Sequence, residues 1–229
     1  MNDFMQREIM ITEDGSHTLF VPELKEHFHS IHGAIQESNH VFIQNGLFKS
    51  NKQKLVVLET GFGTGLNALL TLINRGERDI NYFSIEKYPL TANEYKQLNY
   101  PVLISENLQD LFLSLHQCEW NKEAEIAPGF RLTKIQADLT EFGFKDLPDV
   151  DLIYFDAFAP GKQPEMWTES IFSKIAKHTS PRGIFVTYCA QGEVRRTLTR
   201  VGFKMQRVPG PPGKNEMLFG EKTDSCYSV

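Results

Sequence analysis

Three glycines occupy alternate positions, Gly61, Gly63 and Gly65, directly after the apolar run KLVVLE at 54–59. A glycine-rich turn between a buried strand and a helix lies at the ligand-binding edge of open α/β sheets. Glycine there permits positive φ angles and a close backbone approach that a Cβ atom would block. A tight strand-to-helix turn without a ligand is the alternative interpretation of the same spacing.

The glycine spacing differs from two common phosphate-binding motifs. A P-loop has four residues between its glycines and then Lys followed by Ser or Thr. The dinucleotide motif G-x-G-x-x-G would need glycine where this chain has Leu66. A ligand held through its phosphates is therefore not expected at this turn.

Acidic residues accompany the ends of four successive predicted strands: Glu59, Glu86, Asp138 and Asp156. Such ends share one edge of a parallel sheet, and an acid about 20 residues beyond the turn can accept hydrogen bonds from ribose hydroxyls. S-adenosylmethionine (SAM) carries a sulfonium, an ammonium and no phosphate, so an acid-lined crevice suits it. Each acid taken singly remains open to interpretation as a helix cap, a turn residue or a solvated strand end.

The elements that would position these residues alternate between strands and helices, which predicts a parallel sheet covered on both faces. The last two strands are separated only by PGPPGK, so we expect an antiparallel hairpin at the sheet edge. Strands are predicted at 54–59, 80–86, 130–138, 150–158, 183–189, 203–208 and 215–221. Helices are predicted at 65–75, 90–99, 104–116, 164–179 and 192–202.

This pattern predicts an α/β fold of the class I SAM-dependent methyltransferase (Rossmann-like) type, with a mostly parallel seven-stranded sheet and an antiparallel C-terminal hairpin. Residues 1–50 are expected to form a small extension of a β-hairpin and helices, because β-prone runs flank Asp14 and Gly15. Residues 51–229 would form the SAM-dependent methyltransferase domain, with both parts packed as one compact unit.

The 229 residues carry a formal net charge of −5, whereas nucleic-acid binders are usually basic. An RNA substrate would therefore need a local basic face. The apolar runs are shorter than a membrane span requires, and the N-terminus lacks a signal-peptide pattern. Scattered Cys118, Cys189 and Cys226 are typical of free thiols in a cytoplasmic protein.

Longer motifs resemble the MnmC-like methyltransferase family, the methyltransferase half of the bifunctional tRNA 5-methylaminomethyl-2-thiouridine biosynthesis protein. They are DGSHTLFVPELKEHFHSIHGAIQESNHVFI, LETGFGTGLNALL, SIEKYPLT, DAFAPGKQPEMWTESIF and NEMLFG. The resemblance implies methylation of the primary amine of 5-aminomethyl-(2-thio)uridine at the tRNA wobble position, giving the methylaminomethyl base. It makes the anticodon stem-loop of tRNA the partner and SAM the cofactor, without metal.

Bifunctional members of that family carry an FAD-dependent oxidase domain, and this chain has no second glycine fingerprint. The resemblance therefore implies a stand-alone methyltransferase without FAD or a membrane partner. Its amine substrate would come from a separate FAD-dependent oxidase or another amine-generating enzyme. Two alternatives stay open: a methyltransferase for a small-molecule or protein amine, and a non-catalytic binding subunit with the same fold.

The resemblance also implies residue roles. Glu86 would hold the ribose, Asp138 would lie near the adenine, and Asp156 and Phe158 would lie near the methyl donor and the base. The acceptor amine must be neutral to attack, so Asp156 would orient it or accept its proton. The expected SAM pocket comprises Glu59, Gly61, Gly63, Gly65, Asn67, Glu86, Lys87, Asp138, Asp156, His29 and Ser30.

Substrate contacts are expected from aromatic and basic side chains. Phe158, Tyr154 or Trp167 could stack on a flipped-out uracil, with a core position as the alternative for Tyr154 and Trp167. Basic residues of the C-terminal quarter would contact phosphates, or else form an ordinary solvated helix face. The expected RNA contacts are Phe158, Lys162, Trp167, Arg195, Arg196 and Lys214.

Four histidines, His27, His29, His32 and His40, have no standard zinc spacing and no nearby cysteine, so no metal site is predicted. His29 and Ser30 would instead form a gate over the SAM pocket. A polar helix start packed against the domain is the alternative interpretation of this segment.

Overall fold

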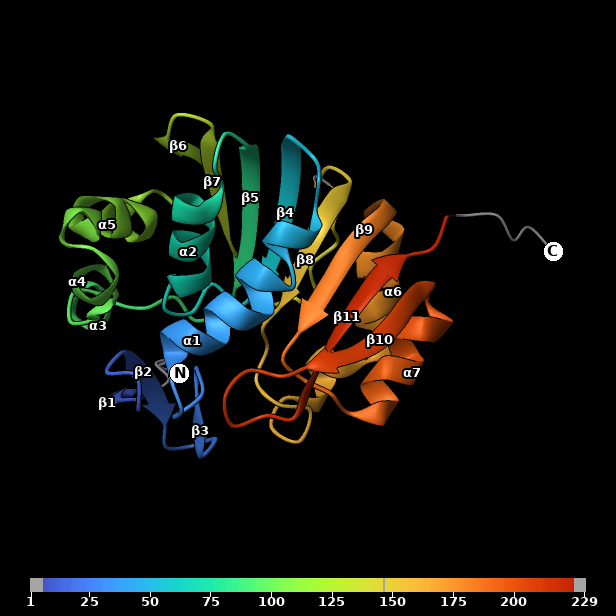
Figure 1. Cartoon of the computed structure of the whole chain (residues 1–229), viewed down its shortest axis with the longest axis horizontal. Helices are drawn as coiled ribbons and strands as arrows, with labels where there is room; N and C mark the ends of the chain where they lie inside the picture. Colours follow the sequence, from blue (N-terminus) through green and yellow to red (C-terminus); the bar gives the residue numbers. More distant parts are fainter. Residues whose placement is uncertain (1–5, 146, 225–229) are drawn as a thin grey trace.

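The computed structural model describes residues 6–145 and 147–224, so Cys226 lies outside the described residues. An eight-stranded sheet, ordered β10-β11-β9-β8-β4-β5-β7-β6, runs through the molecule with helices on both faces (Figure 1). Its strands are β4 (Lys54–Thr60), β5 (Asp79–Glu86), β6 (Glu123–Ala127), β7 (Phe130–Gln136), β8 (Val150–Phe155), β9 (Thr179–Thr187), β10 (Phe203–Pro209) and β11 (Glu216–Lys222).

The central strands are parallel: β4 pairs with β5 and β8, β5 pairs with β7, and β8 pairs with β9. From β4 the chain builds outward to β5 and β7, and then returns to place β8 on the other side of β4. Such a switch point opens a crevice beyond the carboxyl ends of the strands. The antiparallel β10–β11 hairpin completes one edge, as the sequence predicts.

The predicted class of fold is confirmed, but the predicted number of strands is wrong. The eighth strand, β6, pairs antiparallel with β7 across Pro128 and Gly129, in a segment expected to be a loop. Its sequence EAEIA contains two exposed glutamates and no apolar run. An edge strand needs no continuous burial, and this one therefore lacks the signal that identifies the central strands.

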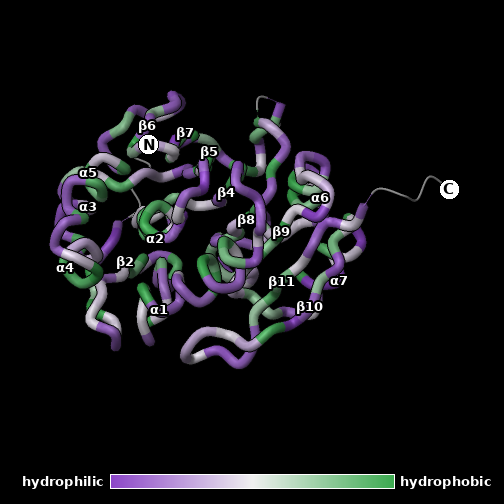
Figure 2. The backbone as a smooth tube through the Cα atoms, turned by 45° about the horizontal axis from the view of Figure 1, so that its top comes forward, coloured by the Kyte–Doolittle hydropathy of each residue, from purple (hydrophilic) through white to green (hydrophobic). Residues whose placement is uncertain are grey.

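Helices cover the two faces of the sheet and bury two separate hydrophobic clusters. In Figure 2, hydrophobic segments lie within α2, α5 and α6, and hydrophilic colour prevails on the outer loops. One cluster includes residues of α1 (Ala34–Ser38), η1 (Asn39–Gln44), η2 (Leu47–Lys49), α2 (Leu66–Asn74) and α5 (Gln109–Gln117). The other includes residues of η4 (Pro164–Trp167), α6 (Glu169–Lys177) and α7 (Gly192–Arg200).

The helix predicted at 90–99 is wrong in extent. A capping box at Thr91 and Glu94 starts α3, which covers only Ala92–Tyr95. A second short helix, α4 (Tyr100–Ile104), begins with Pro101 at a first-turn position, where proline is tolerated. The next turn is η3 (Glu106–Leu108), and α5 then begins at Gln109, later than predicted.

The N-terminal extension forms a three-stranded sheet of β1 (Glu8–Ile11), β2 (His17–Val21) and β3 (Glu26–His27). The predicted β1–β2 hairpin is confirmed. Its turn is held by the Asp14 carboxylate, which accepts hydrogen bonds from Thr12 Oγ1 at 2.8 Å and Ser16 N at 3.0 Å.

Two sets of contacts attach this extension to elements on either side of the crevice. On one side, Arg7 forms an ion pair with Glu94 at 3.1 Å, and Tyr100 Oη donates to the His17 carbonyl at 2.6 Å. On the other side, His40 Nε2 lies 2.8 Å from the Pro209 carbonyl at the end of β10. The extension therefore spans the crevice at the carboxyl ends of the strands.

We predict that Gly65→Ala destabilises the protein more than Gly76→Ala does. Both glycines have positive φ, 72° and 61°, and a left-handed alanine costs about 1–2 kcal/mol. Only at Gly65 would the new Cβ collide, at 2.8 Å from His116 Nε2, whereas Gly76 has open space. Overpacking adds about 1–3 kcal/mol, measurable by urea unfolding, and equal losses in both variants would contradict this assignment.

Candidate active site

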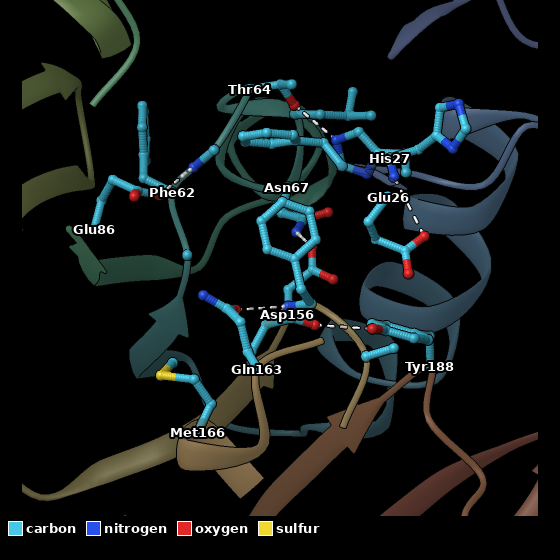
Figure 3. A pocket seen from close by; sticks show the side chains of 18 of the residues that line it. Glu26, His27, Phe62, Thr64, Asn67, Glu86, Asp156, Gln163, Met166 and Tyr188 are labelled. Carbon is cyan, nitrogen blue, oxygen red and sulfur yellow. Dashed lines mark hydrogen bonds between the residues drawn. The ribbon is translucent and has the colours of Figure 1, made fainter. Parts of the chain in front are cut away.

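A cavity of about 610 Å³ lies at the carboxyl ends of β4, β5 and β8, beneath the N-terminal extension (Figure 3). Its walls come from the glycine turn, from the ends of β5 and β8, from the segment between β3 and α1, and from the β10–β11 loop. A volume of this size is typical of a cleft for a small molecule or cofactor.

The glycine turn forms one wall of this cavity. Gly61, Gly63 and Gly65 all have positive φ angles, of 91°, 50° and 72°. A Cβ atom on Gly61 would lie 3.1 Å from the Asp156 carbonyl oxygen, and one on Gly63 would lie 3.1 Å from the Phe28 ring. Gly61 and Gly63 line the cavity, whereas Gly65 lies deeper against His116 and does not.

Glu86 is the last residue of β5 and lines the cavity next to the turn. Its Oε2 accepts a hydrogen bond from Gly63 N at 3.0 Å, and its Oε1 accepts one from Tyr88 N at 2.7 Å. Each carboxylate oxygen keeps further acceptor capacity. The residue can therefore hold the turn and still accept hydrogen bonds from ligand hydroxyls.

Asp138 lies beyond the end of β7 and lines the cavity together with Lys87. The two side chains form an ion pair of 2.8 Å, and Asp138 Oδ1 also accepts from Thr140 N and Oγ1. Partial burial raises the pKa of Asp138, but the hydrogen bonds from Lys87 and Thr140 outweigh this effect and lower the pKa to about 2. The carboxylate is therefore ionised at neutral pH.

Asp156, directly after β8, projects into the middle of the cavity (Figure 3). Asn67 Nδ2 donates a hydrogen bond to its Oδ2 at 2.8 Å. Burial and then the negative charge of Glu37 raise the pKa of Asp156 to about 7, against the Asn67 hydrogen bond and the charge of Lys214. A carboxyl group with this pKa can both accept and release a proton near neutral pH.

Glu37 and Lys214 form a second charged pair in the cavity wall, at 2.5 Å. The Lys214 ammonium also lies 4.0 Å from the centre of the Tyr188 ring, and Glu37 Oε2 accepts from Ser30 N at 2.7 Å. Lys214 was expected on an RNA-binding rim. It instead points into the cavity, because the buried Glu37 carboxylate requires a cation.

His29 and Ser30 line the cavity as expected. His29 Nε2 lies 2.7 Å from Thr64 Oγ1 in the glycine turn, and burial lowers the pKa of His29 to about 4. Its imidazole is therefore neutral near pH 7. Within residues 6–145 and 147–224, no group of three or more His, Cys, Asp or Glu side chains is placed to hold a metal ion.

Several expected site residues lie outside the cavity. Glu59 is fully buried one residue before the end of β4 and turns toward Ser84 and the sheet interior. Trp167 packs on Phe155 in the core and donates its Nε1 hydrogen bond to the Phe158 carbonyl at 2.7 Å. Stacking of Trp167 on a substrate base is therefore wrong, and its role is to support Phe158.

Tyr154 is also buried in the core. Of its two interpretations, the core position is therefore correct and stacking on a uracil is not. Phe158 does line the cavity and makes an edge-to-face contact with Phe28. Lys162 lies outside, with its ammonium bound to the Leu24 carbonyl at 2.8 Å.

Arg195 and Arg196 are exposed on α7, away from the cavity lining. Arg196 forms an ion pair with Glu193 at 2.6 Å. These two residues therefore cannot contact a ligand inside the cavity, and any contribution to binding would involve a larger substrate that reaches α7.

Sequence reasoning missed Glu37, Tyr188 and Phe28 as cavity residues. Glu37 and Phe28 lie inside the long N-terminal motif, in which only His29 and Ser30 were predicted to reach the cavity. Tyr188 directly follows β9, so the rule that singled out acids at strand ends would have found it had it been applied to aromatic residues.

A mostly parallel sheet, a glycine turn after β4 and an acid-lined crevice define a class I methyltransferase. The family model for S-adenosyl-L-methionine-dependent methyltransferases matches residues 104–223. This chain therefore belongs to that family.

Two relatives named MnmC confirm the resemblance seen in the sequence. The chain is 31% identical to the tRNA 5-methylaminomethyl-2-thiouridine biosynthesis bifunctional protein MnmC of Burkholderia thailandensis, over 93% of this chain and 34% of that protein. It is 33% identical to the protein of the same name from Pseudomonas paraeruginosa, over 96% of this chain and 36% of that protein. The chain thus spans about a third of the length of the curated relatives it matches.

Among solved structures, MnmC2 from Aquifex aeolicus superposes with a TM-score of 0.79 at 26% identity. The match covers 97% of this chain and 72% of that one. The shared fold therefore includes the N-terminal extension as well as the central sheet.

We predict opposite effects of two substitutions on the pKa of Asp156. Lys214→Met removes a positive charge and should raise it, whereas Glu37→Gln removes a negative charge and should lower it. Carbon NMR titration of the labelled Asp156 carboxyl group measures both. Lys204→Met, an exposed lysine on β10, is the matched control, and a shift of the same sign in both test variants would contradict the assignment.

Proposed function

We propose that the protein is a SAM-dependent N-methyltransferase that converts 5-aminomethyl-(2-thio)uridine to 5-methylaminomethyl-(2-thio)uridine at the wobble position of tRNA. The observation that carries this proposal is the match of 93% and 96% of the chain to proteins named for this modification. The cavity supports it with a carboxyl group, Asp156, whose pKa of about 7 suits proton exchange with an amine.

The cavity residues fit SAM. Glu86 would hold the ribose hydroxyls, Asp138 would lie near the adenine, and the open backbone at Gly61 and Gly63 would admit the ligand closely. Asn67, Lys87, His29 and Ser30 complete this binding set. The acids favour a cationic ligand over a pyrophosphate. When bound, SAM supplies an electrophilic methyl group.

Asp156 prepares the acceptor amine. An alkylamine is mostly protonated at neutral pH, by analogy with lysine, and cannot attack in that form. The Asp156 carboxylate orients the ammonium through a charge-assisted hydrogen bond and accepts its proton at Oδ1 or Oδ2. Phe158, with Phe28 against its ring, would contact the uracil.

Recognition of the anticodon stem-loop requires contacts beyond the cavity. Lys162, Arg195 and Arg196 would supply phosphate contacts from the loop after β8 and from α7. The aminomethyl group would be generated by a separate FAD-dependent oxidase or another amine-generating enzyme. We infer a cytoplasmic location from the relatives named for tRNA modification. Among the described residues, none of the helices has the length and apolar character of a membrane span.

A second candidate function is methylation of a small-molecule or protein amine. It is favoured by the net charge of −5 and by the pairing of two α7 arginines with acids, Arg196 with Glu193 and Arg200 with Glu169. These pairs reduce the free positive charge available to an RNA backbone.

Transfer of a labelled methyl group from SAM tests the proposed function. Label should enter tRNA that bears 5-aminomethyluridine and should not enter matched tRNA without that group. Asp156→Asn serves as the control for a reaction in this cavity. SAM binding without transfer to either tRNA would contradict the proposed substrate, and transfer to free amines alone would support the second candidate.

We also predict that kcat/KM rises with pH around a midpoint of about 7, where Asp156 loses its proton. Asp156→Asn should lower turnover by about 10²–10⁴ and remove this transition. Asp138→Asn is the control, because a carboxyl group with a pKa of about 2 contributes no transition there. Persistence of the transition in Asp156→Asn would assign it to another group.

A further inference from the structure

The Lys214 ammonium in the cavity wall has no part in the roles proposed above. It accompanies the β10–β11 loop into the cavity, where it donates to Glu37 Oε1 at 2.5 Å and lies 4.0 Å from the centre of the Tyr188 ring. An ammonium has three N–H donors, and among the described residues only Glu37 accepts a hydrogen bond from this one. At least one donor is therefore free for a ligand.

The β10–β11 loop holds this donor in place. Gly213, directly before Lys214, has a φ of +83°, and a Cβ atom there would collide with the His32 ring. Lys214 N also donates to the Pro211 carbonyl at 2.9 Å, which closes the loop on itself. The loop and the Glu37 carboxylate thus fix the ammonium before a ligand binds, and a contact that decides specificity needs such preorganisation.

Lys214 lies in the half of the cavity that the expected cofactor contacts leave open. In Figure 3, Asp156 lies between Glu86, on the cofactor side, and Tyr188. The Lys214 ammonium lies over the Tyr188 ring and hence on the side away from Glu86. Burial raises the pKa of Asp156, and the Lys214 charge partly opposes this rise, so the two side chains are close enough to act on one ligand.

A neutral carbonyl group suits this donor better than an anion. The Lys214 charge is already balanced by Glu37, and an ionised Asp156 would repel a further carboxylate. In 5-aminomethyluridine the aminomethyl group is attached to C5, next to the C4 carbonyl, whereas the C2 position lies across the ring. A base whose amine is held by Asp156 therefore presents its C4 oxygen close by.

We propose that Lys214 determines base specificity: its ammonium donates a hydrogen bond to the C4 carbonyl oxygen of the acceptor base while Asp156 holds the amine. This inference rests on the proposed function, because it takes 5-aminomethyluridine as the acceptor. Cytosine carries an amino group at C4, which is a donor, so the two donors would face each other unpaired. A site built to donate at this position rejects such a base.

Methyl transfer to two tRNAs tests the inference, one with 5-aminomethyluridine and the other with 5-aminomethylcytidine at the wobble position. The ratio of their kcat/KM values cancels changes in folding, in SAM binding and in the protonation of Asp156. The wild-type protein should prefer the uridine. The double variant Glu37→Gln, Lys214→Met removes the donor without leaving a buried carboxylate unpaired, and it should lower this preference about tenfold or more.

Matched variants separate recognition from a structural role. Glu37→Gln alone keeps the ammonium and should keep the preference, as should Lys204→Met, which removes an exposed lysine of β10. If the ion pair serves only to hold the loop, the double variant will keep the preference as well, which would overturn the inference. An unchanged preference together with a tenfold or greater loss of SAM affinity would also overturn it and assign Lys214 to the carboxylate of SAM.

Failure of the proposed function gives a different result. A wild-type protein that binds SAM but methylates neither tRNA would overturn the proposed function and this inference with it. Wild-type methylation of both tRNAs with equal kcat/KM, or an equal preference for the uridine in the wild type and the double variant, would overturn this inference alone.

Discussion

The anchoring of one glycine turn to both neighbouring strands determines the rest of this site. Gly61 N donates to the Ile85 carbonyl at 2.8 Å, and Gly63 N donates to the Glu86 carboxylate at 3.0 Å, so the turn is fixed to β5. On the other side, Asp156 N donates to Thr60 Oγ1 at 3.2 Å, which fixes the end of β8. These hydrogen bonds thereby set the relative positions of the Glu86 and Asp156 carboxylates before any ligand binds.

Carboxyl groups in this small region differ in charge because their surroundings differ. Asp138 is ionised by its lysine and threonine partners, whereas Asp156 titrates near neutrality because burial and Glu37 oppose its ionisation. One edge of the sheet therefore combines a permanently charged wall for a cationic ligand with a carboxyl group that exchanges protons. This division of roles arises from burial and neighbours, since the side chains are chemically alike.

Features set by local sequence were predictable, and features set by distant contacts were not. Apolar runs and the glycine spacing placed the central strands, the turn, Glu86 and Asp156 at the correct edge. Glu59 was misplaced because the last residues of β4 are covered on both faces of the sheet, so its side chain is buried in the interior although it stands next to the end of the strand. The Glu37–Lys214 pair joins positions 177 residues apart, and no pattern in either segment indicates the other.

The wide sequence separation of the cavity walls has a consequence for biosynthesis. Glu37 from the extension and Lys214 from the last hairpin meet across nearly the whole chain, as do His40 and Pro209. Contacts of this kind form late, because a long loop must close before they contribute. A nascent chain on the ribosome thus has its glycine turn early but lacks a complete cavity until the final hairpin has emerged.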